Sequence, residues 1–337
     1  MFGINKKIDF LAIGDTVIDA FIKLTDADRV DIRGEASHEN YKICLPFADK
    51  IPYEEVQVLN AVGNAANAAV SASRLGLNTA FVTNIGDDQN GKDCLASLQS
   101  DGVSTKFVKI NKNIKTNYHY VLWYKTERTI LIKHEEYPYV LPEIGTPKWI
   151  YFSSVSATAF PFHNTVAEYL ERNPGIKLAF QPGKNEIKLG KEKLAGLYKN
   201  SEIFFCNVEE ARVILGREEA SILELAEGLL ALGPKIVSIS DGPNGAYLLL
   251  NGELWKMPLY PDIAPPVERT GAGDAFASTI VAGLALGLSP LEAFTWGPIN
   301  SMSVVQEIGA QKGLLSREKL EEYLSKAPAE YKPTKIN

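Results

Sequence analysis

Short apolar runs alternate with segments of helical periodicity along most of this chain. The predicted strands are residues 10–13, 79–83, 149–152, 176–180, 203–205 and 236–240. The predicted helices are residues 65–75, 163–171, 191–199 and 208–215. This alternation predicts an α/β fold in which helices cover both faces of a mainly parallel sheet. Because ligands of such sheets bind at the carboxyl ends of strands, we expect one shared site at that edge.

Two stretches depart from this pattern and are mixed and polar. Short alternating pieces at 41–45 and 55–59 predict short strands. Residues 118–124 and 129–133 are joined by a short polar turn at 126–128, which predicts a hairpin.

The most informative stretch runs from Glu268 to Gly287 and reads ERTGAGDAFASTIVAGLALG. Phe276, Ile280 and Leu284 recur at helical spacing. The segment is apolar nearly all round, so the predicted helix should be buried.

Three small residues, Gly271, Ala272 and Gly273, lead directly into this helix. Free backbone N–H groups and the positive end of the helix dipole would then point at one spot, which is typical of an anion site. Asp274 lies in the first turn, beside that spot. It is either a carboxylate that complements the dipole or a general base that orients and deprotonates a hydroxyl during phosphoryl transfer.

Composition and charge narrow the function classes. The chain has 337 residues, of which 45% are hydrophobic and 23% charged, as in an ordinary globular protein. A net charge of -6 argues against nucleic acid or an anionic membrane as the main partner, but not against a nucleotide in a local site. No apolar run is long enough for a transmembrane helix, and the start of the chain does not resemble a signal peptide.

Cysteine and histidine give no sign of a metal site. Cys44, Cys94 and Cys206 lack CxxC spacing, so we expect free thiols and a cytoplasmic protein. The four histidines are scattered without metal-ligand spacing, and we expect surface or satisfied side chains at His38, His119, His134 and His163.

The motif RTGAGDAF, followed by an apolar helix, resembles the C-terminal signature of the ribokinase-like (PfkB) carbohydrate kinases. The stretch from Val62 to Cys94 resembles the N-terminal signature of that family, with Gly63 and Asn67 as its clearest matches. Val62 stands where the first glycine of a pair is usual, and valine disfavours a positive φ. The resemblance covers about residues 8–325, and the absence of a GxxxxGK[ST] loop sets the chain apart from P-loop kinases.

The resemblance implies a ribokinase-like three-layer α/β/α fold with a small β-sheet lid that excludes water from the site. We expect the lid at 21–59 and 116–134. The main domain should comprise residues 1–20, 60–115 and 135–327, and residues 328–337 should form a tail. A homodimer through the lid is a candidate assembly.

The same resemblance assigns the acceptor side of the site. Asp19, at the family spacing from Gly14, would bind sugar hydroxyls, for which a carboxylate is a suitable acceptor. Gly63, Asn64 and Asn67 would also face the substrate. The alternative for Asn67 is an asparagine inside a helix that is paired with the backbone.

The nucleotide side is assigned in the same way. Asn207 and Glu210 are three residues apart at a predicted strand-to-helix turn, which a capping box explains fully. The resemblance instead implies that they position the phosphates and Mg²⁺, with Glu210 acting through water; both roles can coexist. The nucleotide would also contact the residues Ser240, Gly242, Gly245 and Asn300.

The resemblance therefore implies an ATP-dependent kinase that phosphorylates a primary hydroxyl of a sugar or sugar-like molecule, with Asp274 as base. Gly271, Ala272 and Gly273 would offer N–H groups to the transferring phosphoryl group. The alternatives are a nucleoside kinase of the same family and a non-catalytic sugar- or nucleotide-binding protein. Glu268, six residues before Asp274, either helps to bind a monovalent cation such as K⁺ or is a solvated residue.

Overall fold

A ten-stranded sheet forms the middle layer of the structure, a computed structural model that describes residues 7–31, 41–124 and 127–336. Its strand order is β16-β15-β14-β13-β12-β11-β10-β1-β6-β7. The strands from β13 to β7 in this order pair in parallel, and β14, β15 and β16 are antiparallel. The strands are β1 (Phe10–Ile13), β6 (Thr79–Gly86), β7 (Ser104–Asn111), β10 (Trp149–Ser153), β11 (Lys177–Gln181), β12 (Ser201–Asn207), β13 (Ile236–Ser240), β14 (Ala246–Leu250), β15 (Glu253–Met257) and β16 (Thr334–Lys335).

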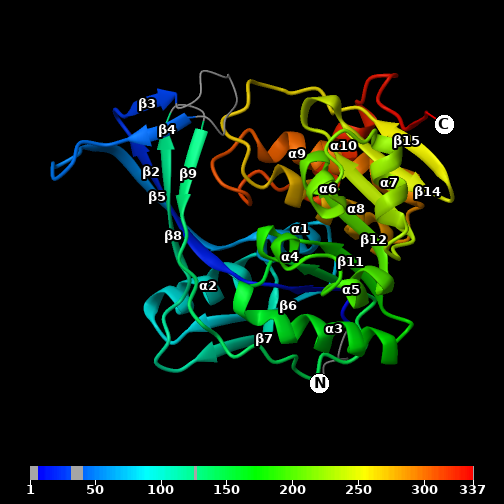
Figure 1. Ribbon diagram of the computed structural model, residues 1–337, viewed down its shortest axis with the longest axis horizontal. Coiled ribbons are helices and arrows are strands. Elements are labelled where there is room, and N and C mark those ends of the chain that lie inside the picture. Colours follow the sequence, from blue (N-terminus) through cyan, green and yellow to red (C-terminus); the bar gives the residue numbers. More distant parts are fainter. Residues whose placement is uncertain (1–6, 32–40, 125–126, 337) are drawn as a thin grey trace.

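Helices cover both faces of this sheet (Figure 1). Side chains alternate along a strand, so Phe10 and Ala12 of β1 belong to one hydrophobic core, while Leu11 and Ile13 belong to the other. The first core includes α1 (Asn64–Arg74), α2 (Gln89–Ser100), α8 (Ala272–Ala285), α9 (Pro290–Val304) and α10 (Arg317–Ser325). The second includes α3 (Phe160–Arg172), α5 (Ala195–Asn200), α6 (Val208–Leu215) and α7 (Ile222–Leu230). This arrangement confirms the predicted three-layer α/β/α fold.

A second, four-stranded sheet stands to one side of these layers (Figure 1). Its order is β5-β2-β8-β9, and a separate pair, β3-β4, lies near its far end. The strands are β2 (Val17–Leu24), β3 (Asp28–Asp31), β4 (Tyr41–Cys44), β5 (Tyr53–Val62), β8 (Tyr118–Tyr124) and β9 (Glu127–Leu131). The boundary that we expected after residue 20 falls inside β2, because this strand begins only four residues after β1 ends.

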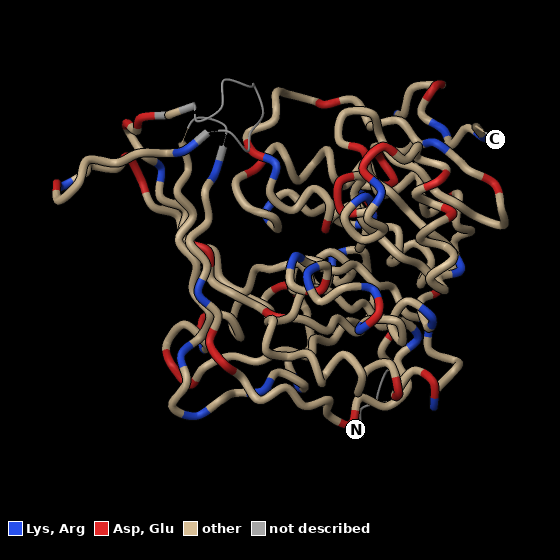
Figure 2. The backbone as a smooth tube through the Cα atoms, in the orientation of Figure 1, with Lys and Arg blue, Asp and Glu red and all other residues tan. Residues whose placement is uncertain are grey.

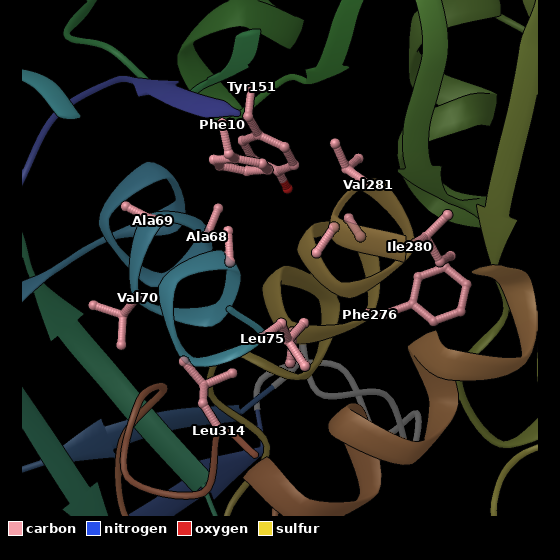
Figure 3. Packing of buried hydrophobic residues seen from close by; sticks show 14 of the residues in the cluster. Phe10, Ala68, Ala69, Val70, Leu75, Tyr151, Phe276, Ile280, Val281 and Leu314 are labelled. Atoms are coloured by element: carbon pink, nitrogen blue, oxygen red, sulfur yellow. The ribbon is translucent and has the colours of Figure 1, made fainter. Parts of the chain in front are cut away.

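Small residues allow α1 and α8 to pack closely beneath the main sheet. Figure 3 shows Ala68 and Ala69 of α1 beside α8, whose Ile280 and Val281 are buried in the same cluster. Alanine keeps the helix backbones close without loss of helix propensity. This packing places the first turn of α1 next to the first turn of α8.

Asn300 on α9 is a structural residue rather than part of a nucleotide site. Its side chain is fully buried, and Nδ2 donates to Thr279 Oγ1 at 2.7 Å. Its Oδ1 accepts from the backbone N–H of Leu315 at 2.9 Å. The nucleotide contact expected at Asn300 is therefore wrong, because its amide joins α9 to α8 and to the segment before α10.

The C-terminal residues also differ from expectation. Residues 328–337 were expected as a tail, yet β16 pairs with β15 and Tyr331 is buried. Arg128 was expected in the turn at 126–128, but it lies in β9 and pairs with Trp123 of β8. Residues 125–126 lie outside the described chain. Four described helices, α2, α4 (Lys184–Leu189), α7 and α10, were not predicted.

Charged residues of both signs are interspersed along the chain, as Figure 2 shows. None of the described helices combines the length and the apolar character that crossing a membrane requires.

Candidate active site

The carboxyl ends of four neighbouring strands meet along one edge of the main sheet. Ser153 ends β10 and pairs with Gln181, which ends β11. Asn207 ends β12 and pairs with Ser240, which ends β13. The register of the parallel strands therefore brings these four residues, which are far apart in the sequence, to one edge of the sheet.

The small-residue loop before α8 has the conformation that its sequence predicts. Gly271 is the N-cap, with φ of 77°. A Cβ there would lie 2.3 Å from the Cβ of Ala310, so no larger residue fits. Gly273 has open space, with no atom within 4 Å of an added Cβ. The loop and the first turn of this helix can therefore present N–H groups to an anion.

Asp274 lies at the centre of a polar network built from separate elements. Asn67 Nδ2 of α1 donates to Asp274 Oδ2 at 2.8 Å, and Gln181 Nε2 of β11 lies 3.4 Å from Oδ1. Gln311 Nε2 donates to Asn67 Oδ1 at 3.0 Å, and the Tyr151 hydroxyl donates to Gln181 Oε1. The carboxylate is thereby held in one orientation at the start of α8.

Burial decides the protonation behaviour of this carboxylate. Asp274 is 9% exposed, and desolvation raises its pKa from 3.8 to about 6. Hydrogen bonds from Asn67, Gln181 and Asn64 lower the pKa and oppose part of that effect. A carboxylate with a pKa near 6 is a stronger base than a solvent-exposed one and is still ionised at neutral pH.

The Glu268 carboxylate joins the loop before α8 to the segment at Gly309. Its Oε1 accepts from Gly309 N at 2.8 Å, and its Oε2 accepts from Thr270 N at 3.0 Å. Arg128 of β9 approaches Oε2 to 3.6 Å. Because its side chain is only 5% exposed, the expectation of a solvated Glu268 is wrong.

The predicted nucleotide residues lie at the other end of the strand edge. Asn207 Oδ1 accepts from Glu210 N at 2.8 Å, and Glu210 Oε2 accepts from Asn207 N at 2.9 Å, so both halves of the capping box are present. Burial, with Asp274 as a lesser contributor, raises the pKa of Glu210. Gly242 and Gly245 flank the turn after Ser240, with φ of 48° and 93°.

The predicted acceptor residues lie at the junction of the two sheets. Gly63 has φ of 117°, and a Cβ there would lie 3.0 Å from the carbonyl oxygen of Asp15. Asn67 N donates to Gly63 O at 2.8 Å, which links this turn to Asp274. Valine at position 62 raised the question of a strained positive φ, but the positive φ values here belong to Gly63 and to Ala61, whose φ is 55°.

Asp19 lies on β2 and faces the residue paired with it on β8. His119 Nδ1 is 3.3 Å from Asp19 Oδ1. Asp15, which follows β1, accepts hydrogen bonds from the Tyr139 hydroxyl at 2.8 and 2.9 Å. Burial raises the pKa of Asp15 to about 7.

Several residues of this site were not predicted from the sequence. Gln181 could have been found, because it follows a predicted strand at the edge where ligands bind. Gln311 and Tyr139 carry no such signal, since only the tertiary fold brings them to Asn67 and Asp15. Within 7–31, 41–124 and 127–336, no three His, Cys, Asp or Glu side chains form a cluster that could bind a metal unaided.

Comparison with known proteins gives one consistent result. The profile of the pfkB family of carbohydrate kinases matches residues 35–317. A fructokinase of Klebsiella pneumoniae is 26% identical over 256 residues, which cover 70% of this chain and 81% of that protein. An ATP-dependent 6-phosphofructokinase of Thermoanaerobacterium thermosaccharolyticum is 26% identical, with 91% and 90% covered. The ribokinase of Arabidopsis thaliana complexed with ribose and ATP superposes with a TM-score of 0.75 at 20% identity, with 94% and 98% covered.

The burial of Asp274 predicts a pH-dependent stability change for Asp274→Asn. The folded-state pKa of about 6 exceeds 3.8, so ionising this group costs stability as pH rises from about 4 to about 6, and the cost is constant at higher pH. The neutral asparagine avoids that cost. Relative to the wild type, the variant should gain about 1–3 kcal/mol of unfolding free energy at pH 8 compared with pH 4.

Urea unfolding at both pH values measures this difference. Asp262→Asn, which removes an exposed carboxylate, serves as the control and should show no comparable gain. An equal effect of Asp274→Asn at pH 4 and pH 8 would contradict the assigned burial cost.

Proposed function

The chain belongs to the pfkB family of carbohydrate kinases, and we propose that it transfers the γ-phosphoryl group of ATP to a primary hydroxyl of a sugar or sugar-like molecule, with Asp274 as general base. The observation that carries this proposal is the buried Asp274 carboxylate in the first turn of α8, directly beside the Gly271–Gly273 loop.

The proposed step needs a base and a site for developing negative charge. An oxygen of Asp274 accepts the hydroxyl proton as the hydroxyl oxygen attacks the γ-phosphorus, and ADP leaves with the bridging electron pair. Asn67 and Gln181 keep the carboxylate aimed at the acceptor. The N–H groups of the loop at 271–273 stabilise the charge on the transferring group.

The nucleotide is proposed to lie along the carboxyl edge from Gly271 towards the turn after Ser240. Gly242 leaves open space there, since an added Cβ would meet no atom within 4 Å. Mg²⁺, carried by the phosphates, would neutralise their charge. Glu210 is suited to contact its water shell, because only its Oε2 is used in the helix cap that Asn207 completes.

Asp19, Gly63, Asn64 and Asn67 are proposed to line the acceptor side. A coupled assay of ADP release over sugars and nucleosides tests the whole proposal. Turnover of nucleosides alone would favour a nucleoside kinase, and binding without turnover of any compound would favour a non-catalytic protein.

A homodimer through the second sheet is also proposed. One row of paired residues across this sheet runs through Val58, Ala20, Tyr120 and Leu131. Three of these four apolar side chains are exposed, at 49% for Tyr120, 50% for Val58 and 51% for Leu131. Asp19 and His119 lie on the opposite face, because side chains alternate along each strand. A second copy would cover the apolar face and leave the site open. A monomer mass at all concentrations in analytical ultracentrifugation would contradict it.

Asp274→Asn should reduce kcat by about 10²–10⁴-fold, because it removes the base and keeps the size of the side chain. The Kd of ATP should change little. The measurement is ADP release at saturating acceptor, together with calorimetric binding of ATP. Near-normal turnover would leave Asp274 as a residue that only complements the helix dipole.

Asn67→Ala should move the acidic limb of the pH–rate profile upward. Activity requires ionised Asp274, so kcat/KM should rise with pH through about 6 and then level off. Removing the hydrogen bond from Asn67 raises the pKa of the carboxyl group further. Gln89→Ala, an exposed amide on α2, is the control, and an unshifted limb in Asn67→Ala would exclude this role.

The proposed K⁺ site predicts a faster initial rate in K⁺ than in a bulky organic cation at equal ionic strength. The ion would order the loop next to Glu268. Glu268 already holds Thr270 and Gly309 by hydrogen bonds, and an equal rate in both cations would leave it with that bracing role alone.

A further inference from the structure

Three buried polar atoms without a hydrogen-bond partner lie close together where β2, β8 and the segment after β9 meet. Among the atoms of this kind in residues 7–31, 41–124 and 127–336, they are Asp19 Oδ1, His119 Nε2 and His134 Nδ1. His119 is 8% exposed, and its ring meets the ring of His134 edge-on with centroids 5.2 Å apart. The 3.3 Å contact between Asp19 Oδ1 and His119 Nδ1 lacks hydrogen-bond geometry.

A buried polar atom without a hydrogen-bond partner lowers the stability of the fold, unless a bound ligand supplies that partner. A ligand here would meet an acceptor on Asp19 and ring nitrogens on His119 and His134, each of which can donate or accept. Hydroxyl groups match this set, because each one can both donate and accept.

The cluster adjoins the proposed acceptor pocket. His134 Nδ1 lies 3.7 Å from Asp15 Oδ2. The carbonyl of Asp15 abuts Gly63, whose own carbonyl accepts from Asn67 N. Asn67 in turn holds Asp274, so a continuous path of contacts joins the cluster to the proposed base.

The charges around the cluster disfavour an anionic ligand. Asp15 and Asp19 both contribute carboxyl groups. In the described chain their ion-pair partners are histidines, with no lysine or arginine among them. Lys133, which precedes His134 in the chain, pairs with Glu135 at 2.8 Å, and Arg128 of β9 lies 3.6 Å from Glu268. Burial lowers the pKa of His134, with His119 as a further cause, and so favours its neutral form.

We propose that Asp19, His119 and His134 select an acceptor whose non-reacting end is uncharged and rich in hydroxyls, and that they reject acceptors bearing a phosphate or carboxylate there. This inference rests on the proposed kinase function. A sugar phosphate would place its own phosphate group at this cluster, and binding that group would require a lysine or arginine facing it.

Matched acceptors test the inference. Fructose and fructose 6-phosphate share a free hydroxyl at C1 and differ by one dianionic group, and ribose and adenosine extend the neutral set. The best neutral acceptor should exceed fructose 6-phosphate in kcat/KM by at least about 100-fold, because a buried charge without a partner is strongly rejected.

Two variants give the inference an internal check. His119→Ala should raise KM for the best neutral acceptor by about 10-fold and leave KM for ATP unchanged. His134→Lys adds a cation and should reduce the neutral-to-anionic ratio of kcat/KM by about 10-fold or more. Lys133→Gln is the matched control, since that side chain is 71% exposed next to His134, and it should leave the ratio unchanged.

The outcomes distinguish the inference from the proposed function. Preference for fructose 6-phosphate, or an unchanged ratio in His134→Lys, would overturn the inference while the kinase function stands. If none of the acceptors is phosphorylated, the kinase proposal fails. Thermal stabilisation by each compound then decides the inference, which is supported only if neutral compounds stabilise the wild type more than fructose 6-phosphate and His119→Ala removes that effect.

Discussion

The buried carboxylate of Asp274 is the constraint around which the site is arranged. A carboxylate that is 9% exposed must be held by hydrogen bonds, and its partners Asn67 and Gln181 come from a helix on one face of the sheet and from the sheet itself. Close packing of α1 on α8 through alanines is what brings Asn67 within reach. The small residues of both signature segments therefore serve the packing of α1 on α8.

A second set of contacts joins the four-stranded sheet to the loop before α8. A Cβ on Gly309 would lie 2.1 Å from Leu59 Cδ1 of β5, and Gln311 Nε2 donates to Ala61 O at 2.8 Å. Gly309 N also donates to Glu268, which holds Thr270. β5 thus contacts the segment that Glu268 joins to Thr270, so a shift of β5 would move the loop before α8.

Local patterns predicted much of this fold because the relevant signals are short-range. The apolar run at 10–13 became β1, the segment at 208–215 became α6 with its capping box, and the glycine before α8 became a left-handed N-cap. The resemblance to a family supplied the order of these pieces. Asn300 was misassigned because a motif position does not reveal whether an amide faces a ligand or a helix contact.

The contacts that the sequence could not predict join residues that are far apart along the chain. Tyr139 and Asp15 are 124 residues apart, and Gln311 and Asn67 are 244 apart. Scattered histidines gave no signal, since only the pairing of β2 with β8 sets His119 against Asp19. The proposed recognition of the acceptor would depend on such remote contacts. Asp19 and His119 lie on paired strands, yet Asp19 Oδ1 and His119 Nε2 lack hydrogen-bond partners, and no motif in the chain predicts that.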